Sequence, residues 1–231
     1  MQTNEFSRLL NHLKIRFTNP AVLEQAFYHR SYLNEVKLNI ESNERLEFLG
    51  DAVLSLCVSN YLFAERSNDA EGELTNLRAY VVKTKSLAQA AKELNLGSYL
   101  KLSKGEELGG GRENPQLLAN TYEALLGAIY LDQGLEAVQS VIKNTLLSLF
   151  AKELKSGPPK DAKSGLQEMV QDKFKQSPSY RILETKGPDH AKQFTVAVYN
   201  KNEQYGKGTG ASKQIAEEEA AAEALGKLQT K

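Results

Sequence analysis

Apolar residues recur at helical spacing along the first two thirds of the chain. Segments such as residues 86–94 and 135–154 repeat them every three to four positions, which is typical of helices that bury one face. Up to about residue 155, no stretch alternates convincingly between apolar and polar residues as a half-buried strand would. The pattern therefore predicts an all-α domain over residues 1–154.

The helical pattern stops at a short segment that contains glycine and two prolines. Residues 155–160 (Lys-Ser-Gly-Pro-Pro-Lys) cannot continue a helix and offer little apolar surface to bury. We therefore expect a linker over these residues and a second domain over residues 161–231.

The second domain has a different pattern. A helical segment is expected at residues 164–175, and an Ala- and Glu-rich helix at residues 213–228 has apolar side chains to cover one face of a sheet. Between the two helices, strand character is found at residues 180–185, 193–199 and 203–208. The expected fold is a small α+β domain with the order α-β-β-β-α.

Charge and cysteine content limit the classes of function. The chain of 231 residues has 29 Lys and Arg against 29 Asp and Glu, so any nucleic-acid site has to be a local patch. The single cysteine, Cys57, excludes an internal disulfide. The first residues lack the features of a signal peptide, and polar residues interrupt the apolar stretches. We expect a cytoplasmic protein without a membrane partner.

Three carboxylates fall on one face of an expected helix. Glu44, Glu47 and Asp51 stand at positions i, i+3 and i+7 within residues 43–54. Because carboxylates stacked without interleaved lysines repel one another, a bound cation would stabilise them. The alternative is a solvated acidic face without a ligand. The apolar neighbours favour burial, and a buried carboxylate has to be paired or metal-bound.

A second segment offers further oxygen ligands. Asn114 and Pro115 are typical of a helix start, and Asn120 and Glu123 share a face of the helix expected over residues 116–131. Small residues on this helix would allow it to approach the first acidic helix closely. Carboxylate and amide oxygens without His or Cys favour Mg²⁺ or Mn²⁺ over Zn²⁺. Phosphodiester hydrolysis is the reaction that such a centre suits best.

Both acidic segments resemble sequences of the ribonuclease III family. Residues 43–54 are similar to the family's signature stretch and residues 118–132 to its second acidic motif, while residues 27–32 and 71–79 resemble two further family segments. The resemblance implies a metal-dependent endoribonuclease that cuts double-stranded RNA and leaves 5′-phosphate and 3′-hydroxyl ends. It also implies roles in the processing and decay of rRNA and mRNA.

The same resemblance implies roles for individual residues. Glu47, Asp51, Asn120 and Glu123 would surround the metal, with Asp51 and Glu123 catalytic, and Glu44 and Glu71 would assist. Phe48 would insert into a pocket of a second copy in a homodimer.

One position departs from the family pattern, because Asn120 stands where the family usually has Asp. An amide oxygen can ligate a metal but carries no charge. Two alternatives therefore stay open. One is a catalytically weak double-stranded RNA-binding protein that retains the fold. The other is a metal site that acts on a different phosphodiester or pyrophosphate.

Residues 161–231 resemble a double-stranded RNA-binding domain, which reads the shape of the duplex across two minor grooves. The residues expected to contact RNA are Gln167, Glu168, His190, Lys192, Ser212 and Lys213. Where the family clusters basic residues after Lys213, this chain has Gln214 and Ile215. Binding is therefore expected to be weaker and less sensitive to salt.

The remaining reactive side chains are expected to be structural. His12 and His29 have no second His or Cys at metal-binding spacing. Cys57 stands among apolar residues, which favours a buried hydrophobic role over a nucleophile.

Overall fold

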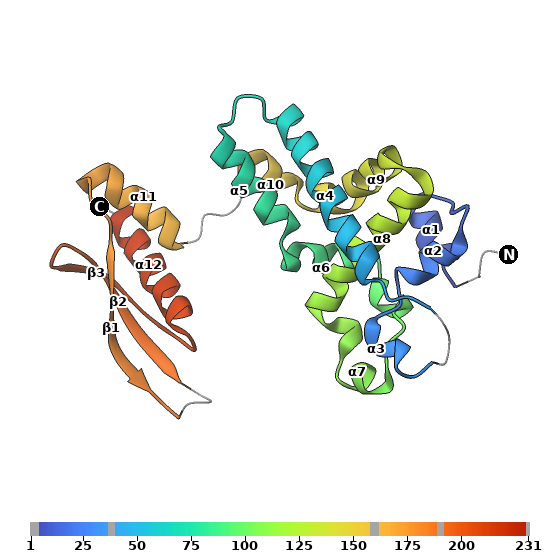
Figure 1. Cartoon of the computed structure of the whole chain (residues 1–231). Coiled ribbons are helices and arrows are strands. Elements are labelled where there is room, and N and C mark those ends of the chain that lie inside the picture. Colours follow the sequence, from blue (N-terminus) through green and yellow to red (C-terminus); the bar gives the residue numbers. More distant parts are fainter. Residues whose placement is uncertain (1–4, 37–39, 158–161, 189–191, 230–231) are drawn as a thin grey trace. The chain divides into compact units, whose positions relative to one another are not determined.

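The structure is a computed structural model that describes residues 5–36, 40–157, 162–188 and 192–229. The chain divides into two compact units, Met1–Pro158 and Pro159–Lys231, each of which is considered by itself (Figure 1). The predicted fold class is confirmed, because the first unit is helical and the second has the order α-β-β-β-α. His190, which was expected to contact RNA, lies outside the described residues.

Within its described residues, the first unit contains helices and a single isolated β-bridge between Tyr28 and Lys101. The α-helices are α1 (Ser7–Leu13), α2 (Pro20–Gln25), α3 (Arg30–Leu33), α4 (Glu44–Glu65), α5 (Glu71–Val82), α6 (Thr84–Glu93), α7 (Lys104–Leu108), α8 (Pro115–Gln133), α9 (Leu135–Ile142) and α10 (Ala151–Ser156). Short 3-10 segments η1 (Leu96–Tyr99) and η2 (Gly111–Glu113) and a π-helical segment η3 (Lys143–Leu147) connect them.

Helices α4 and α8 form the centre of this unit and cross at two glycines (Figure 1). A Cβ at Gly50 would overlap the carbonyl oxygen of Glu123, and a Cβ at Gly127 would overlap the carbonyl oxygen of Leu46. The two backbones therefore touch directly, which only glycine permits. The small residues predicted to allow this approach do so.

Helix α4 is long and apolar enough to cross a membrane by length and composition alone. In this structure it is a core helix, because Leu54, Val58 and Leu62 on its inner face are almost completely buried. Cys57 is also buried, as predicted, and burial raises the pKa of its thiol. It is a packing residue of the core.

Residues 135–154 are helical, as the pattern predicts, but they do not form one regular α-helix. Helix α9 continues into the wider π-helical turn η3, and an interruption at Phe150 precedes α10, which begins at Ala151. The Thr145 hydroxyl in η3 donates to the Val141 carbonyl and lies 2.7 Å from the hydroxyl of the fully buried Tyr122. A buried phenol needs such a partner, and the wider turn places one there. Helix α10 then continues to Ser156, two residues into the expected linker, and ends before Gly157 at φ 85°.

The second unit is a three-stranded antiparallel sheet with two helices on one side (Figure 1). Its elements are α11 (Ala162–Phe174), β1 (Ser179–Lys186), β2 (Gln193–Asn200), β3 (Glu203–Gly210) and α12 (Lys213–Gln229), with the strands in the order β1-β2-β3. The strands predicted from the sequence match these to within two residues at each end. Leu166, Val170, Val198 and the alanines of α12 form the core.

Alternate glycines of β3 allow α12 to lie against the strand backbone. A Cβ at Gly206 or Gly208 would overlap backbone atoms of Ala220, and one at Gly210 would overlap Ile215. On the helix side the contact is made by alanines, of which Ala216 and Ala220 are completely buried. The Ala-rich run therefore covers the sheet as predicted, but at shorter range than larger apolar residues would allow.

The glutamates of α12 are tied to neighbouring elements of the same unit. Glu217 forms an ion pair with Lys163 at 2.6 Å, and Glu218 accepts a hydrogen bond from the backbone N–H of Ala162. Glu219 and Glu223 accept from the backbone N–H groups of Thr209 and Lys207 on β3, at 3.1 and 2.7 Å. Glu219 and Glu223 thus satisfy donors along the edge strand β3, whose unpaired backbone groups would otherwise attract another chain.

Candidate functional site

The crossing of α4 and α8 brings the predicted acidic residues together. Glu47 and Asp51 stand one turn apart on α4 on either side of Gly50, and Asn120 and Glu123 lie on α8. Because Gly50 touches the backbone of Glu123, the backbones of α4 and α8 are in direct contact at this point. The Asn43 side chain donates to the Ala26 carbonyl at 3.2 Å and anchors the start of α4, while Asn114 caps the start of α8 as predicted.

Glu123 is the most perturbed carboxyl group of this cluster. Burial raises its pKa from an ordinary value of 4.5 to about 7, and repulsion from the Asp51 and Glu47 carboxylates acts in the same direction. The carboxyl group therefore lies among like charges in a partly dry environment. A cation placed there would favour its ionised form.

Glu47 is perturbed in the same direction, for partly different reasons. Burial raises its pKa, and the carboxylates of Glu44 and Asp51 raise it further. A hydrogen bond from the Asn120 side chain opposes this by stabilising the ionised form. Glu47 is thus held between like charges on α4 and a neutral amide on α8.

A pocket of about 350 Å³ opens beside these residues. Glu44, Glu47 and Asn120 line one part of it, and His29 and Arg30 line another. The Arg30 guanidinium lies 3.8 Å from the Glu44 carboxylate, and both side chains are largely exposed. Glu44 also accepts a hydrogen bond from the Ser42 hydroxyl at 2.9 Å. The pocket thus has a cation at its rim and carboxylates on its wall.

His29 is a structural residue of this pocket, as predicted. Its Nδ1 accepts from the backbone N–H of Ser31 at 3.3 Å and lies 2.8 Å from the Ser31 hydroxyl, so the ring caps helix α3. Since Nδ1 is an acceptor, the neutral ring carries its proton on Nε2. Burial lowers the pKa of His29, which favours this neutral form. His12 lies in the last turn of α1 and forms no hydrogen bond or ion pair with the described residues.

The donor set of the cluster fits a hard divalent cation. Glu47, Asp51 and Glu123 provide carboxylate oxygens, and their mutual repulsion is the condition that a cation relieves. Among the described residues, no three Asp, Glu, His or Cys side chains already stand close enough together to enclose a metal. Rotation of the carboxylate side chains is therefore required to surround one.

Glu71 does not join the other carboxylates within one copy of the chain. It lies at the start of α5, accepts a hydrogen bond from the Thr75 hydroxyl at 2.9 Å, and lines a separate pocket of about 350 Å³ with Phe63 and Arg78. This second pocket is next to the end of α4, whereas Glu47 and Asp51 lie near its beginning.

Large apolar side chains project outward from α4. Phe48 is 82% exposed, Phe63 is 77% exposed and Leu56 is 48% exposed. Phe48 was predicted as a dimer contact, but Phe63 and Leu56 were not. Their spacing of seven to eight residues places all three on one face of the helix, a signal that was visible in the sequence.

Two further residues with defined side-chain hydrogen bonds were not predicted from the sequence. Gln116, one turn before Asn120 on α8, donates through Nε2 to the Asn120 Oδ1 at 2.7 Å. Asp132, the last residue of the second acidic motif, accepts hydrogen bonds from Thr18 and Asn19 and ties the end of α8 to the start of α2. Burial acts to raise the pKa of Asp132, but these bonds lower it below its ordinary value.

In the second unit, the predicted RNA contacts lie on two helices and a strand end. Gln167 and Glu168 are exposed on α11, and Lys192 is exposed just before β2. Ser212 accepts from the Ile215 backbone N–H at 3.2 Å, which places Lys213 at the start of α12.

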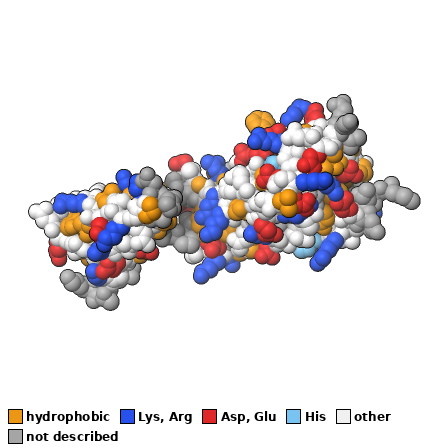
Figure 2. All heavy atoms as spheres, turned by 90° about the horizontal axis from the view of Figure 1, so that it is seen from below, with side chains coloured by type: hydrophobic (Ala, Val, Ile, Leu, Met, Phe, Trp, Pro, Cys, Tyr) orange, Lys and Arg blue, Asp and Glu red, His pale blue; other side chains and the backbone are white. Residues whose placement is uncertain are grey.

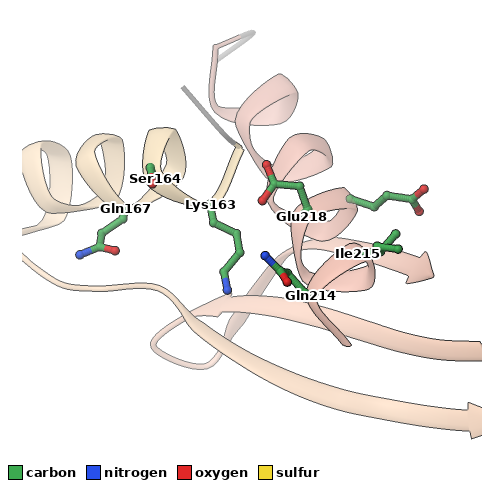
Figure 3. A pocket seen from close by; sticks show the side chains of 7 residues that line it. Lys163, Ser164, Gln167, Gln214, Ile215 and Glu218 are labelled. Atoms are coloured by element: carbon green, nitrogen blue, oxygen red, sulfur yellow. The ribbon is translucent and has the colours of Figure 1, made fainter. Parts of the chain in front are cut away.

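A hollow of about 620 Å³ separates α11 from the start of α12 and contains both polar and charged groups. Figure 3 shows Lys163 and Gln214 extending into it, with Gln167 at its α11 side and Glu218 on α12. The ion pair between Lys163 and Glu217 reduces the positive charge available here. In the space-filling view, acidic and basic side chains are interspersed, in agreement with the balanced charge of the chain (Figure 2).

Family models match both units. A model described as Ribonuclease-III-like matches residues 19–149, and one described as Double-stranded RNA binding motif matches residues 162–228.

Individual proteins are similar over nearly the whole chain. Ribonuclease 3 of Pelotomaculum thermopropionicum is 45% identical over 223 residues, which cover 96% of this chain and 92% of that protein. Ribonuclease 3 of Bacillus cereus is 50% identical over 215 residues, which cover 93% of this chain and 87% of that protein.

A solved structure is similar to the first unit. It is the nuclease domain of ribonuclease III from Campylobacter jejuni, described as flexible in a region involved in dimer formation. It is 40% identical to this chain, with a TM-score of 0.59, and the match covers 63% of this chain and 99% of that one.

Proposed function

Because this chain belongs to the ribonuclease III family and is an endoribonuclease that acts on double-stranded RNA, we propose that Glu47, Asp51 and Glu123 form its catalytic centre. Mg²⁺ is the proposed cofactor, and Mn²⁺ is the proposed substitute. The observation that carries this proposal is the Glu123 carboxyl group, whose pKa of about 7 reflects burial and two neighbouring carboxylates. A divalent cation would relieve this repulsion and, when bound, would supply the Lewis acidity that phosphodiester hydrolysis needs.

The residues of the chain would then divide the remaining work. The contact of Gly50 with the Glu123 backbone fixes the separation of α4 and α8, and with it the positions from which the carboxylates act. Arg30, at the rim of the adjacent pocket, is a cation placed to meet a phosphate of the RNA strand. The His29 ring lines the same pocket and caps α3. The proposed products have 5′-phosphate and 3′-hydroxyl ends.

The second unit would hold the duplex. Gln167 and Glu168 on α11 can hydrogen-bond to 2′-hydroxyl groups in the shallow minor groove, and Lys213 at the start of α12 can neutralise a phosphate. Lys192 and His190 are proposed as further contacts. We propose structured precursors of rRNA and mRNA as the substrates and the cytoplasm as the place of action.

We also propose that the first unit works as a homodimer through the outer face of α4. Phe48, Leu56 and Phe63 expose more apolar surface than isolated surface residues would, which is typical of an interface. A symmetric contact would bring Phe48 of one copy to the same face of the other, where the pocket beside Phe63 can receive an aromatic ring. The Campylobacter jejuni nuclease domain has a region involved in dimer formation, which supports a homodimer of this chain but not a particular contact.

A cleavage assay with a matched variant tests the catalytic centre. The wild-type protein and Glu123→Ala are incubated with labelled long double-stranded RNA and single-stranded RNA, with Mg²⁺, with Mn²⁺ and with EDTA. We expect only the wild type to cut, only the duplex, and only with metal, while both proteins bind the duplex equally in Ca²⁺. Cleavage by Glu123→Ala at the wild-type rate would refute the assignment of the centre.

The oligomeric state is tested separately. Phe48→Ala should shift the protein toward monomer in sedimentation experiments, whereas Leu108→Ala, at a side chain 89% exposed on α7, should not. A wild-type protein that is monomeric at all concentrations would contradict the homodimer and leave the assignment of the carboxylates intact. Among the described residues nothing favours the catalytically weak alternative, because Glu47, Asp51 and Glu123 are all present and the carboxylates of Asp51 and Glu47 act on that of Glu123.

A further inference from the structure

The Arg112 side chain joins three parts of the first unit. Its Nη1 donates to the backbone carbonyls of Gly97 and Leu100, each at 2.9 Å, and its Nε donates to the Glu107 carboxylate at 2.7 Å. Arg112 belongs to η2 and stands two residues before Asn114, which caps α8. A guanidinium group can only donate and stays charged in proteins, so the direction of these hydrogen bonds is unambiguous.

The two carbonyls lie in and directly after η1, at the end of a short helix, where carbonyl groups lack partners within the helix. The backbone of Gly97 also touches that of Arg112, because a Cβ at Gly97 would overlap the Arg112 carbonyl oxygen. Arg112 therefore fastens residues 97–101 to the chain just before α8. Lysine is not an equivalent residue here, since it lacks the planar fork of the guanidinium group.

The segment fastened by Arg112 in turn holds the chain that leads to Arg30. The Lys101 N–H donates to the Phe27 carbonyl at 2.9 Å, and the Lys101 carbonyl accepts from the His29 N–H at 3.2 Å. Lys101 thus pairs on both sides with the chain just before α3, of which Arg30 is the first residue. The position of Arg30 therefore depends on this segment, and through it on Arg112.

The pocket beside the acidic cluster is bounded by this series of contacts. Arg30 and Leu100 line it from one side, and Leu117 lines it from the first turn of α8. The start of α4 is tied to the same chain, because the Asn43 N–H donates to the Tyr28 carbonyl at 2.8 Å. The guanidinium group closes this ring of contacts between the wall that carries Arg30 and the start of α8.

We propose that Arg112 is a positioning residue of the endoribonuclease, which holds Arg30 where one RNA strand can meet both its guanidinium group and the carboxylates of the catalytic centre. This inference rests on the proposed function of the same site and deepens it. Arg112 is not among the residues that line the pocket, so it acts through Arg30 and not by contact with RNA. A small displacement of Arg30 is costly, because reaction rates depend steeply on the placement of the reacting groups.

A double-variant cycle tests this role. The rate constant for cleavage of long double-stranded RNA in Mg²⁺ is measured under single-turnover conditions at saturating protein, for wild type, Arg30→Met, Arg112→Met and the double variant. We expect each single substitution to lower this rate constant on the order of tenfold, because the strand is misplaced. In the Arg30→Met background, Arg112→Met should have a further effect of about twofold or less, since the group that it positions is gone.

The non-additivity separates a positioning role from a structural one. A residue that only stabilises the fold would lower the unfolding temperature and would change the rate constant by the same factor in both backgrounds. All rate constants are therefore measured well below the unfolding temperature of every variant, which circular dichroism determines.

The matched control is Arg66→Met. Arg66 is also a partly buried arginine, and its Nη1 donates to the backbone carbonyls of Leu154 and Lys155 at 2.9 and 2.6 Å, while its Nη2 pairs with the Asp69 carboxylate at 2.6 Å. It directly follows the last residue of α4 and does not line the pocket. Arg66→Met should lower the unfolding temperature, as Arg112→Met does, but leave the single-turnover rate constant unchanged.

The cycle can overturn the proposal in two ways. One is a wild-type rate constant in folded Arg112→Met or in Arg30→Met. The other is an equal loss on replacing Arg112 with and without Arg30. If Arg112→Met does not fold, Arg112→Lys takes its place in the cycle, because it keeps the charge without the planar fork, and the same non-additivity is expected at a smaller amplitude.

A Glu123→Ala variant in the same assay separates this proposal from the proposed function. An inactive Glu123→Ala together with an unaffected Arg112→Met would reject only the positioning role. Cleavage by Glu123→Ala at the wild-type rate would reject the catalytic centre and the positioning role with it. Loss of cleavage in Glu123→Ala, with the non-additivity described, would support the two together.

Discussion

The two units of this protein use glutamate in opposite ways. On α12, Glu217, Glu218, Glu219 and Glu223 each meet a lysine or a backbone N–H of a neighbouring element. At the crossing of α4 and α8, by contrast, Glu47 and Glu123 lie next to other carboxylates, and their pKa values are raised.

This difference separates structural carboxylates from chemical ones. A carboxylate paired with a donor contributes to folding and has little reason to bind a cation, whereas carboxylates packed against one another cost stability until a cation arrives. A run of three consecutive glutamates is therefore weaker evidence of a metal site than Glu47 and Asp51 placed against Glu123 by two touching helices.

The largest expected difference between the two groups is in catalysis. Asp51→Asn should lower the cleavage rate of double-stranded RNA in Mg²⁺ on the order of a thousandfold, because it removes charge from the centre where the phosphodiester reacts. Glu219→Gln, which removes charge from the structural group, should leave the rate constant at saturating RNA unchanged. A comparable loss in both variants would show that the distinction between structural and chemical carboxylates is mistaken.

The glycine contacts of the two units can be broken in the same way. Gly50→Ala should destabilise the first unit and Gly208→Ala the second, each by about 1–3 kcal/mol or more, because the new Cβ meets backbone atoms that cannot move freely. Gly72→Ala is the control, since its Cβ would meet open space in α5, and it should stabilise slightly. Hydrogen exchange measured by mass spectrometry reports each unit separately. Equal protection in all three variants would contradict the close contacts.

The two groups of carboxylates also predict opposite responses to pH. The pKa of Glu123 is about 7 in the folded protein and near 4.5 when unfolded, so without metal the first unit should gain stability as the pH falls from 7 toward 4.5. The pKa of Glu223 is lowered by hydrogen bonds from Lys227 and from the Lys207 backbone, so its contribution to the second unit is lost only below about pH 4.5.

Calorimetry in EDTA between pH 4.5 and 7.5 measures this response. In Glu123→Gln the gain of stability on acidification should be smaller than in the wild type, whereas Glu223→Gln should leave it unchanged. A first unit whose unfolding temperature is constant over this range in the wild type would refute the raised pKa of Glu123.

The smallest expected effect concerns the RNA contact of the second unit. Gln214→Lys places a cation at the hollow between α11 and α12 and should strengthen duplex binding a few-fold. It should also steepen the dependence of log K on log salt by about one unit, since one more phosphate is neutralised. Gln204→Lys on β3 is the control for added charge away from this hollow. An unchanged salt slope in Gln214→Lys would indicate that this end of α12 does not meet a phosphate.

Much of the fold was determined by local sequence patterns. These patterns act over a few residues: they are the helical and alternating periodicities, the Gly-Pro-Pro segment and the Asn114–Pro115 start of α8. They therefore predicted the helical first unit and the α-β-β-β-α order of the second. Periodicity did not specify the π-helical turn η3 or the interruption at Phe150 within residues 135–154.

The sequence by itself also determined which residues could form the acidic cluster, because spacing along a helix decides which side chains share a face. Only the tertiary structure decided how these faces meet. Backbone contact at Gly50 and Gly127 places Glu123 against Asp51 and Glu47. Glu71 lies apart from them, in the pocket next to the end of α4. The tertiary structure likewise decided that the Asn120 Oδ1 accepts a hydrogen bond from Gln116. The physical reason is that burial, repulsion and the direction of a hydrogen bond depend on neighbours from other elements, which periodicity along one helix does not specify.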